Sequence, residues 1–180
     1  FTTLLDRVMV DDKKYIQFLH HPKVIELVVM LINELTKVEG PVAPKRATSF
    51  VAKCFGLKSV QAARQEEILE AIPVSKFKRD PEDFIFPAGI DPKKFDTWAK
   101  QSDSSQRAIS EISLVELANA MASICSKTAG MQSAELCKQT ALAFGTTRLT
   151  TAIEKRLFDA EQHGIKLGRL RQEGGVTFIK

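Results

Sequence analysis

The sequence lacks the segments of a membrane protein and the motifs of a nucleotide-driven motor. No apolar run approaches the ~18 to 20 residues that a membrane-spanning helix needs, and the longest, residues 24–32, is interrupted by Glu26. The chain has no Gly-x-x-x-x-Gly-Lys-Ser/Thr loop for phosphates and no acidic pair in a context suited to magnesium. We therefore expect no membrane partner, no cofactor, no small-molecule ligand and no catalytic residue.

Cysteine and histidine are also scarce. The three cysteines, Cys54, Cys125 and Cys137, fall on apolar positions of expected helices. An odd count without paired spacing indicates reduced core thiols in a cytoplasmic protein rather than disulfides or a zinc site. The adjacent His20 and His21 cannot both face one metal from a regular helix, and His163 falls where a helix is expected to end. The first residue is phenylalanine, so we interpret the chain as a piece of a larger protein.

One pattern of helices and glycines occurs twice, about 90 residues apart. In the first copy 16 residues separate Gly40 from Gly56, and in the second 15 separate Gly130 from Gly145. The second glycine of each pair follows a phenylalanine at the end of a helical stripe. In each copy a third helix and a turn-rich stretch follow. Three helices and a hairpin, present twice, predict a mainly α fold with small β-hairpins, organised as tandem winged helices.

The pattern also predicts where the parts begin and end. We expect a helical extension over residues 1–21, a first winged helix over 22–87, a linker over 88–112 and a second winged helix over 113–180. The expected third helix of the first copy is capped by Ser59, and its hairpin covers residues 74–87. In the second copy Ser113 and Glu116 form a capping box. Its third helix starts at Thr147 or Thr151 and ends near Gly164, and its hairpin covers residues 165–180.

Several short motifs resemble a known family. Glu39-Gly40-Pro41-Val42 in the first copy, Phe84 to Pro87 at its hairpin, and Arg107 to Leu117 before the second copy are similar to the C-terminal region of large bacterial superfamily 1 helicase-related proteins. In those proteins a domain of unknown function follows the helicase motor and a restriction-endonuclease-like domain. The resemblance covers residues 24–87 and 107–164. It implies that the parent protein is an ATP-dependent nucleic-acid remodeller, and it carries over no catalytic residues to this region.

Charge distinguishes the two copies. Around the first copy's third helix, Lys58 and Arg64 stand against three glutamates, whereas residues 146–180 carry seven cations against four carboxylates. Phosphates should therefore be repelled by the first helix and attracted by the second. The candidate nucleic-acid-binding residues are Arg148, Thr151, Lys155, Lys166, Arg169 and Arg171. A second basic group lies on the first hairpin and consists of Lys76, Lys78 and Arg79.

These features favour a non-catalytic accessory module that binds DNA through backbone contacts, within a larger helicase or nuclease-type protein. A protein-interaction module that docks on the motor or on another partner is the alternative. The same charges also fit ordinary solvated faces on a protein of net charge +4.

Overall fold

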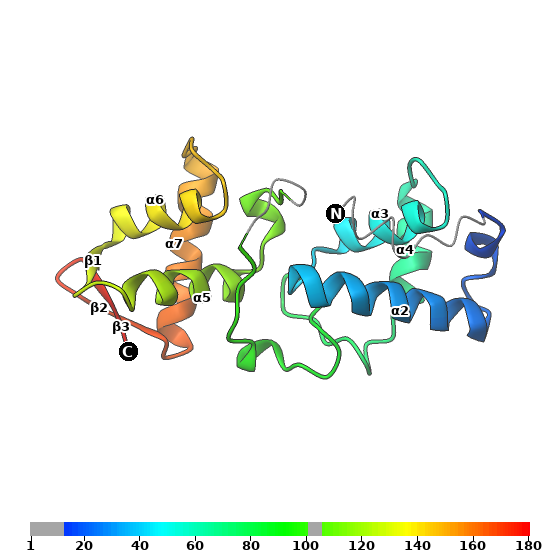
Figure 1. Ribbon diagram of the computed structural model, residues 1–180, viewed down its shortest axis with the longest axis horizontal. Helices are drawn as coiled ribbons and strands as arrows, with labels where there is room; N and C mark the ends of the chain where they lie inside the picture. The colour runs from blue at the N-terminus through cyan, green and yellow to red at the C-terminus, as the bar shows by residue number, and fades with distance from the viewer. Residues whose placement is uncertain (1–12, 101–105) are drawn as a thin grey trace. The chain divides into compact units, whose positions relative to one another are not determined.

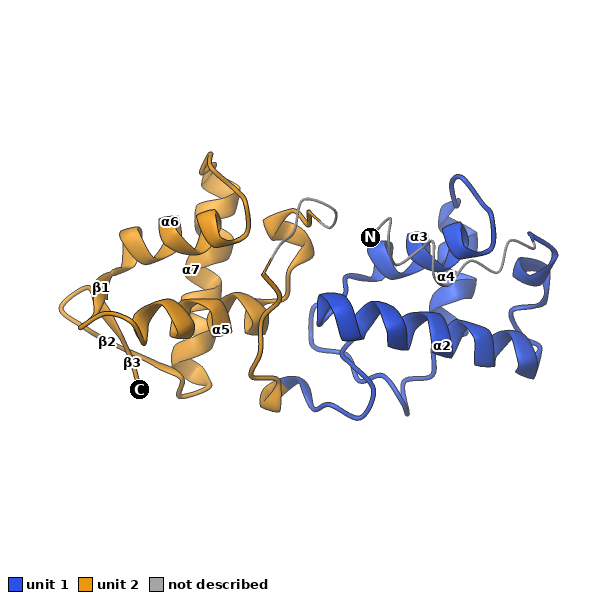
Figure 2. Ribbon diagram, in the orientation of Figure 1, with its two compact units in different colours: residues 1–92 blue, residues 93–180 orange. Residues whose placement is uncertain are grey.

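The chain forms two compact units, residues 1–92 and 93–180 (Figures 1 and 2). A computed structural model describes residues 13–100 and 106–180. This described part is mainly helical, with one three-stranded antiparallel sheet, which confirms a mainly α fold with little β-structure. Within it, none of the helices combines the length and the apolar character needed to cross a bilayer.

The first unit is built on three α-helices. A 3-10 helix, η1 (Lys13–Phe18), leads into α2 (Pro22–Glu39), α3 (Pro44–Cys54) and α4 (Ala62–Glu70). Ile16 and Leu19 are buried in the same core as the three helices, so this part of the expected extension belongs to the first unit. Residues 1–12 of that extension lie outside the described residues.

The second unit carries three α-helices and the sheet. The 3-10 helix η2 (Pro92–Lys94) spans the boundary in sequence, and η3 (Ile109–Glu111) precedes α5 (Leu114–Cys125). The short strand β1 (Met131–Gln132), α6 (Ser133–Ala143), α7 (Thr151–Lys166), β2 (Leu170–Glu173) and β3 (Val176–Ile179) follow. The strand order is β1-β3-β2, and α7 runs across α5 (Figure 1). Leu117, Met121, Leu136 and Leu157 pack in the core between the helices.

The two Phe-Gly helix ends are confirmed and have the same geometry. Gly56 and Gly145 have φ values of 78° and 73°, which suit glycine because it has no Cβ to clash. The N–H groups of Leu57 and Thr146 each donate back to a carbonyl near the helix end, at 2.9 Å, as in a Schellman motif. Phe55 is fully buried, and Phe144 is 2% exposed. Both phenylalanines therefore anchor their helix ends in a core.

The two expected hairpins have different outcomes. In the second unit β2 and β3 pair around Gly174-Gly175, whose positive φ values suit a tight two-residue turn, so this hairpin is confirmed. Residues 74–87 reverse direction, with the Phe86 N–H donating to the Lys78 carbonyl at 2.9 Å, but the two expected strands do not form, because the described segment has only isolated bridges, from Ile85 to Val42 and to Arg79. A carboxylate oxygen of Asp80 accepts the N–H groups of Glu82 and Phe84, at 3.0 and 2.9 Å. This local capture leaves fewer N–H groups for a regular ladder.

Much of the segment predicted as a linker, residues 88–112, packs against the second unit instead. The side-chain amide of Asn119 on α5 donates to the carbonyls of Phe95 and Thr97, at 3.0 and 2.7 Å. The Trp98 ring packs edge-on against Phe144, with 5.5 Å between centroids. Residues 93–100 and 106–112 therefore belong to the second unit, which is larger than 113–180.

Helix boundaries also differ from the sequence prediction in three places. The N-cap of α4 is Gln61 rather than Ser59, and that of α7 is Thr150, whose hydroxyl accepts the N–H of Ile153. Helix α7 continues to Lys166, past the predicted stop at Gly164. A Cβ at Gly164 would lie 2.8 Å from Leu170 and 3.2 Å from Ala118. Gly164 therefore permits close packing inside the helix rather than ending it.

Candidate nucleic-acid interface

Helix α7 has a buried face and an exposed face. Leu157, Ala160 and Gly164 are buried against the core. The opposite side exposes Thr151, Lys155, Phe158 and Lys166, at spacings that place them on one side of the helix. Arg148 is exposed in the loop before α7. We call Arg148, Thr151, Lys155 and Lys166 the α7 basic face. Within the described part of the chain, none of its three cations forms an ion pair.

Arg156 fixes α7 to the rest of the unit. Its guanidinium donates to the carbonyl of Ile109, at 3.0 Å, and to that of Ile112. Ile109 is the first residue of η3 and Ile112 directly follows it, so the arginine joins α7 to the segment that precedes α5. The positive charge of Arg156 is therefore directed inward and adds little to a phosphate-binding surface.

Arg169 is held by contacts within the second unit rather than standing free on its surface. Its guanidinium donates to the Asn119 side-chain carbonyl and, at 2.9 Å, to the backbone carbonyl of Lys93. Burial lowers the pKa of Arg169 from its ordinary value, and nearby Asp96 partly opposes this shift. The side chain ties the segment near residue 93 to α5, so its first role is structural. Because two of its N–H donors are engaged in these contacts, Arg169 does not belong to the α7 basic face.

Arg171 lies on the second hairpin and is exposed. Its guanidinium carbon stands 4.5 Å from the centroid of the Phe178 ring, and the side chain forms an ion pair with Glu173. The aromatic contact holds the arginine along the hairpin surface. Glu173 therefore balances part of the charge of Arg171, in contrast to the cations of the α7 basic face.

The first unit presents a different surface. Helix α4 exposes Glu66, Glu67 and Glu70, and Arg64 is bound to Glu67 and to the carbonyl of Ile16. This surface is acidic, as the charges in the sequence indicated, and repulsion of phosphate by it stays a prediction.

The second basic group is only partly accessible. Lys76 is exposed, whereas Lys78 lies 4.0 Å from a carboxylate oxygen of Asp91. Arg79 is half-buried and donates to the Leu69 carbonyl in the last turn of α4, at 3.1 Å. Arg79 therefore closes the end of a helix, a role that its place in a basic cluster does not reveal.

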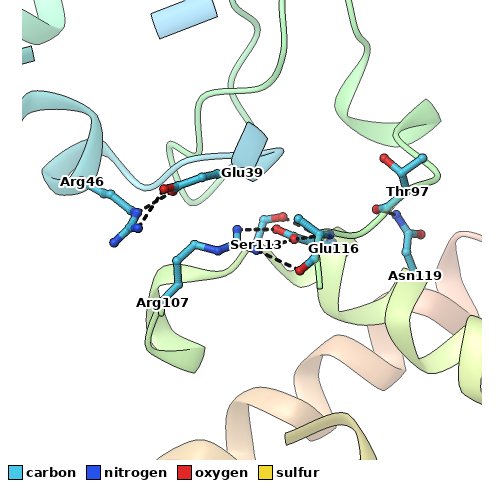
Figure 3. A network of polar contacts seen from close by, with 8 residues as sticks. Glu39, Arg46, Thr97, Arg107, Ser113, Glu116 and Asn119 are labelled. Atoms are coloured by element: carbon cyan, nitrogen blue, oxygen red, sulfur yellow. Dashed lines mark hydrogen bonds and ion pairs between the residues drawn. The ribbon is translucent and has the colours of Figure 1, made fainter. Parts of the chain in front are cut away.

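Buried polar pairs are the feature that the sequence analysis missed (Figure 3). Arg107 and Glu116 in the second unit form a two-bond ion pair, at 2.9 and 2.7 Å, with side chains 2% and 0% exposed. Glu116 also accepts the Ala99 N–H at 3.1 Å, in addition to the expected Ser113 cap. The sequence held one signal of this pair, since Glu116 lies on the buried side of its expected helix. The capping box with Ser113 explains a glutamate at that position without a partner cation, so the pair was not predicted.

Two more carboxylates are buried, one in each unit. Within the first unit, Glu39 at the end of α2 binds Arg46 at the start of α3, with one of the two bonds at 2.8 Å (Figure 3). Within the second unit, Glu161 accepts the hydroxyls of Ser133 and Thr177, which joins α7 to α6 and β3. Glu161 is fully buried, so it does not oppose phosphate at the surface as an exposed acid on α7 would.

The three cysteines are buried, as predicted. Burial raises the pKa of the Cys54 thiol to about 12. Burial, with smaller contributions from Glu161 and Glu154, raises the pKa of Cys137 to about 11. Burial and Glu161 also raise the pKa of Cys125. All three are thiols rather than thiolates near neutral pH.

We expect the cysteines of the folded chain to resist thiol reagents. At pH 8, modification by a disulfide reagent should be more than roughly tenfold slower than in denaturant, because the thiolate is the reacting form. The raised pKa values also predict that folding stability falls as pH rises above about 9, since the unfolded chain then releases protons that the folded chain retains. Absorbance of the released thiolate and urea titrations at pH 8 and 10 would measure both effects. Rapid native modification would contradict the burial of these thiols.

Comparison with protein-family models, with curated proteins and with solved structures gives no match for this chain. The resemblance to helicase-related proteins therefore rests on its sequence motifs and stays a prediction. The class defined by the structure is a mainly helical protein of two units, with a small antiparallel sheet in the second.

Proposed function

We propose that this chain is a non-catalytic, tandem winged-helix module that binds DNA for a larger helicase or nuclease-type protein. The observation that carries the proposal is the α7 basic face. It combines three exposed cations without ion-pair partners in the described part of the chain with a helix whose opposite side is anchored in the core. Phosphate contacts need such cations, and they supply affinity without base recognition.

The order of elements in the second unit supports the winged-helix part of the proposal. Helix α6 and helix α7 are joined by a turn after Phe144, and the β2–β3 hairpin follows directly. Strand β1, between α5 and α6, pairs with β3. In helix-turn-helix proteins the second helix of the pair enters the major groove. Helix α7 has that position in this unit.

The first unit supports the tandem arrangement in part. It has three helices in the same order, and the bridge from Val42 to Ile85 corresponds to the pairing of Gln132 with Val176. Its third helix is acidic at the surface, and its hairpin segment forms no strand among the described residues. We therefore assign DNA contact to the second unit and a supporting role to the first.

Charge reversal on the α7 basic face should weaken DNA binding. We expect Lys155→Glu and Lys166→Glu each to lower affinity for duplexes of unrelated sequence by roughly three- to tenfold at low salt, because an exposed phosphate contact becomes repulsive. Fluorescence anisotropy of labelled duplexes measures the effect. The matched control is Lys58→Glu, an exposed lysine before α4, where glutamates already oppose phosphate. Equal effects of all three substitutions would argue against an interface on α7.

A protein-binding function is the second candidate, and Phe158 favours it. This side chain is 51% exposed on the outward side of α7, and Leu142 on α6 is 43% exposed. Exposed apolar residues are common at protein interfaces. If Lys155→Glu leaves DNA binding unchanged while Phe158→Ala abolishes binding to the remainder of the parent protein, the docking function takes precedence.

A further inference from the structure

The second unit contains a hollow of about 650 Å³ that no part of the proposed DNA surface uses. Small side chains line it at the end of α5, namely Ala122 and Ser123 of the helix and Ser126 at its C-cap. Trp98, Arg169 and Lys180 also line it. None of the lining residues belongs to α7, so occupation of the hollow does not depend on contacts by that helix. We call this feature the Trp98 hollow.

Trp98 is held in a fixed position at this hollow. Its ring packs edge-on against the buried Phe144, at 5.5 Å between centroids and an interplanar angle of 62°. The residue is half-buried, so one part of the indole rests on the core while another part lines the hollow. A fixed aromatic surface beside small side chains is suited to a planar ring, because stacking then costs little conformational entropy.

Two cations line the hollow, and the Lys180 N–H donates to the Arg169 carbonyl at 3.0 Å. Arg169 is fixed by Asn119 and by the Lys93 carbonyl, and these bonds use two of the five N–H donors of a guanidinium. The Lys180 ammonium lies close to the backbone of Gly168, at 3.9 Å from the position that a Cβ would occupy there. A pre-positioned arginine with a lysine at its side is a common arrangement for binding phosphate.

One side-chain carboxylate lines the hollow and opposes an anion there. Asp96 lines the hollow and raises the pKa of Arg169, against the effect of burial, so it lies close enough to attract the guanidinium. An incoming phosphate competes with Asp96 for that charge. Removal of the carboxylate should therefore strengthen binding, whereas removal of a cation should weaken it.

We propose that the Trp98 hollow binds a nucleotide, with the phosphate at Arg169 and Lys180 and the planar base against Trp98. The volume is within the usual range of small-ligand sites, roughly 300 to 1,000 Å³. The hydroxyls of Ser123 and Ser126 line the hollow and offer partners for sugar and base edges. The Ser126 hydroxyl donates to the Ser123 carbonyl, so the Ser126 hydroxyl oxygen can still accept a hydrogen bond. The ligand is either a free mononucleotide or the unpaired terminal nucleotide of a strand. Both sources present the same chemistry.

The position of Trp98 makes the test direct, because it is the only tryptophan in the chain. The chain is titrated with dAMP, with deoxyadenosine and with inorganic phosphate, and tryptophan emission is recorded. We expect saturable quenching with dAMP at concentrations where deoxyadenosine and phosphate have little effect. A 5′-phosphorylated single strand, compared with its unphosphorylated form, distinguishes the strand end from the free nucleotide as the source.

Four variants separate the proposal from non-specific quenching. Asp96→Asn should strengthen dAMP binding and Lys180→Gln should weaken it, each by roughly three- to tenfold. Ser123→Leu should abolish binding by filling the hollow. Leucine is a good helix former, and Ser126→Leu replaces this variant if it fails to fold. Lys100→Gln removes an exposed charge outside the lining and is the control.

The result that overturns the proposal is the absence of saturable quenching by dAMP and by the phosphorylated strand alike. Quenching that Asp96→Asn, Lys180→Gln and the leucine variants leave unchanged overturns it equally. Duplex binding through α7 would be unaffected by either result, because its test uses lysines outside the Trp98 hollow.

Discussion

Replacing Arg107 with alanine is expected to lower the free energy of unfolding of the second unit by about 3–5 kcal/mol. The substitution leaves the Glu116 carboxylate without its cation in a position where the side chain is fully buried. A buried carboxylate that loses its ion-pair partner must stay desolvated or take up a proton, and both cost free energy. The bonds between Arg107, Glu116 and Ala99 also hold the segment before α5 on that helix.

Urea denaturation followed by circular dichroism measures this effect. The double variant Arg107→Met/Glu116→Leu is the matched control, because it removes both charges and retains apolar volume. We expect it to recover much of the stability that Arg107→Ala loses. A loss below about 1 kcal/mol for Arg107→Ala would show that the pair is accessible to water in solution.

Truncating Phe144 to alanine should destabilise the second unit by about 3–5 kcal/mol, as a large-to-small change in a core. The side chain is 2% exposed and packs against Trp98. Loss of the ring leaves a cavity and removes the support of the tryptophan. Phe55→Ala should have a similar effect on the first unit, where that residue is fully buried.

Phe158 supplies the control for this prediction because it is the same residue type at a surface position. It is 51% exposed on α7, so Phe158→Ala should change stability by about 0.5 kcal/mol or less. Thermal unfolding of the three variants, with tryptophan emission as a second probe for Phe144→Ala, gives the comparison. Equal destabilisation by Phe144→Ala and Phe158→Ala would contradict the core assignment of Phe144.

The sequence predicted those features of the fold that local patterns encode. The spacing of apolar residues located the helices. The Phe-Gly pairs located two helix ends, because a helix commonly ends at a glycine that adopts a positive φ, and this signal depends only on neighbouring residues. The double-glycine turn located the β2–β3 hairpin for the same reason. The segment before Pro87 had similar strand and turn residues, but Asp80 bonds to its own neighbours there and no strand forms in it.

The candidate site was predicted less well because contacts between residues far apart in the sequence decide which of its charges remain exposed. Arg169 meets Asn119 across 50 positions, and Arg156 meets Ile109 across 47. A count of charges along the chain treats these arginines as equivalent to Lys155 and Lys166 and so overestimates the positive charge at the surface. The count also includes Glu161, which is buried, and so overestimates the negative charge there. The exposed cations of this region without ion-pair partners in the described part of the chain are Arg148, Lys155, Lys166 and Lys180. The exposed carboxylates on α7 are Glu154 and Asp159, so the cations outnumber them.

The dependence of duplex affinity on salt tests the central claim most directly. The chain is titrated against a labelled duplex at several salt concentrations, and the triple variant Arg148→Gln/Lys155→Gln/Lys166→Gln is titrated in parallel. We expect wild-type binding at low salt, with a plot of log K against log salt that is steeper than the variant's by about 0.9 for each phosphate that the variant no longer neutralises. No binding by the wild-type chain at low salt, or identical slopes for the two proteins, would contradict the assignment of DNA contact to α7.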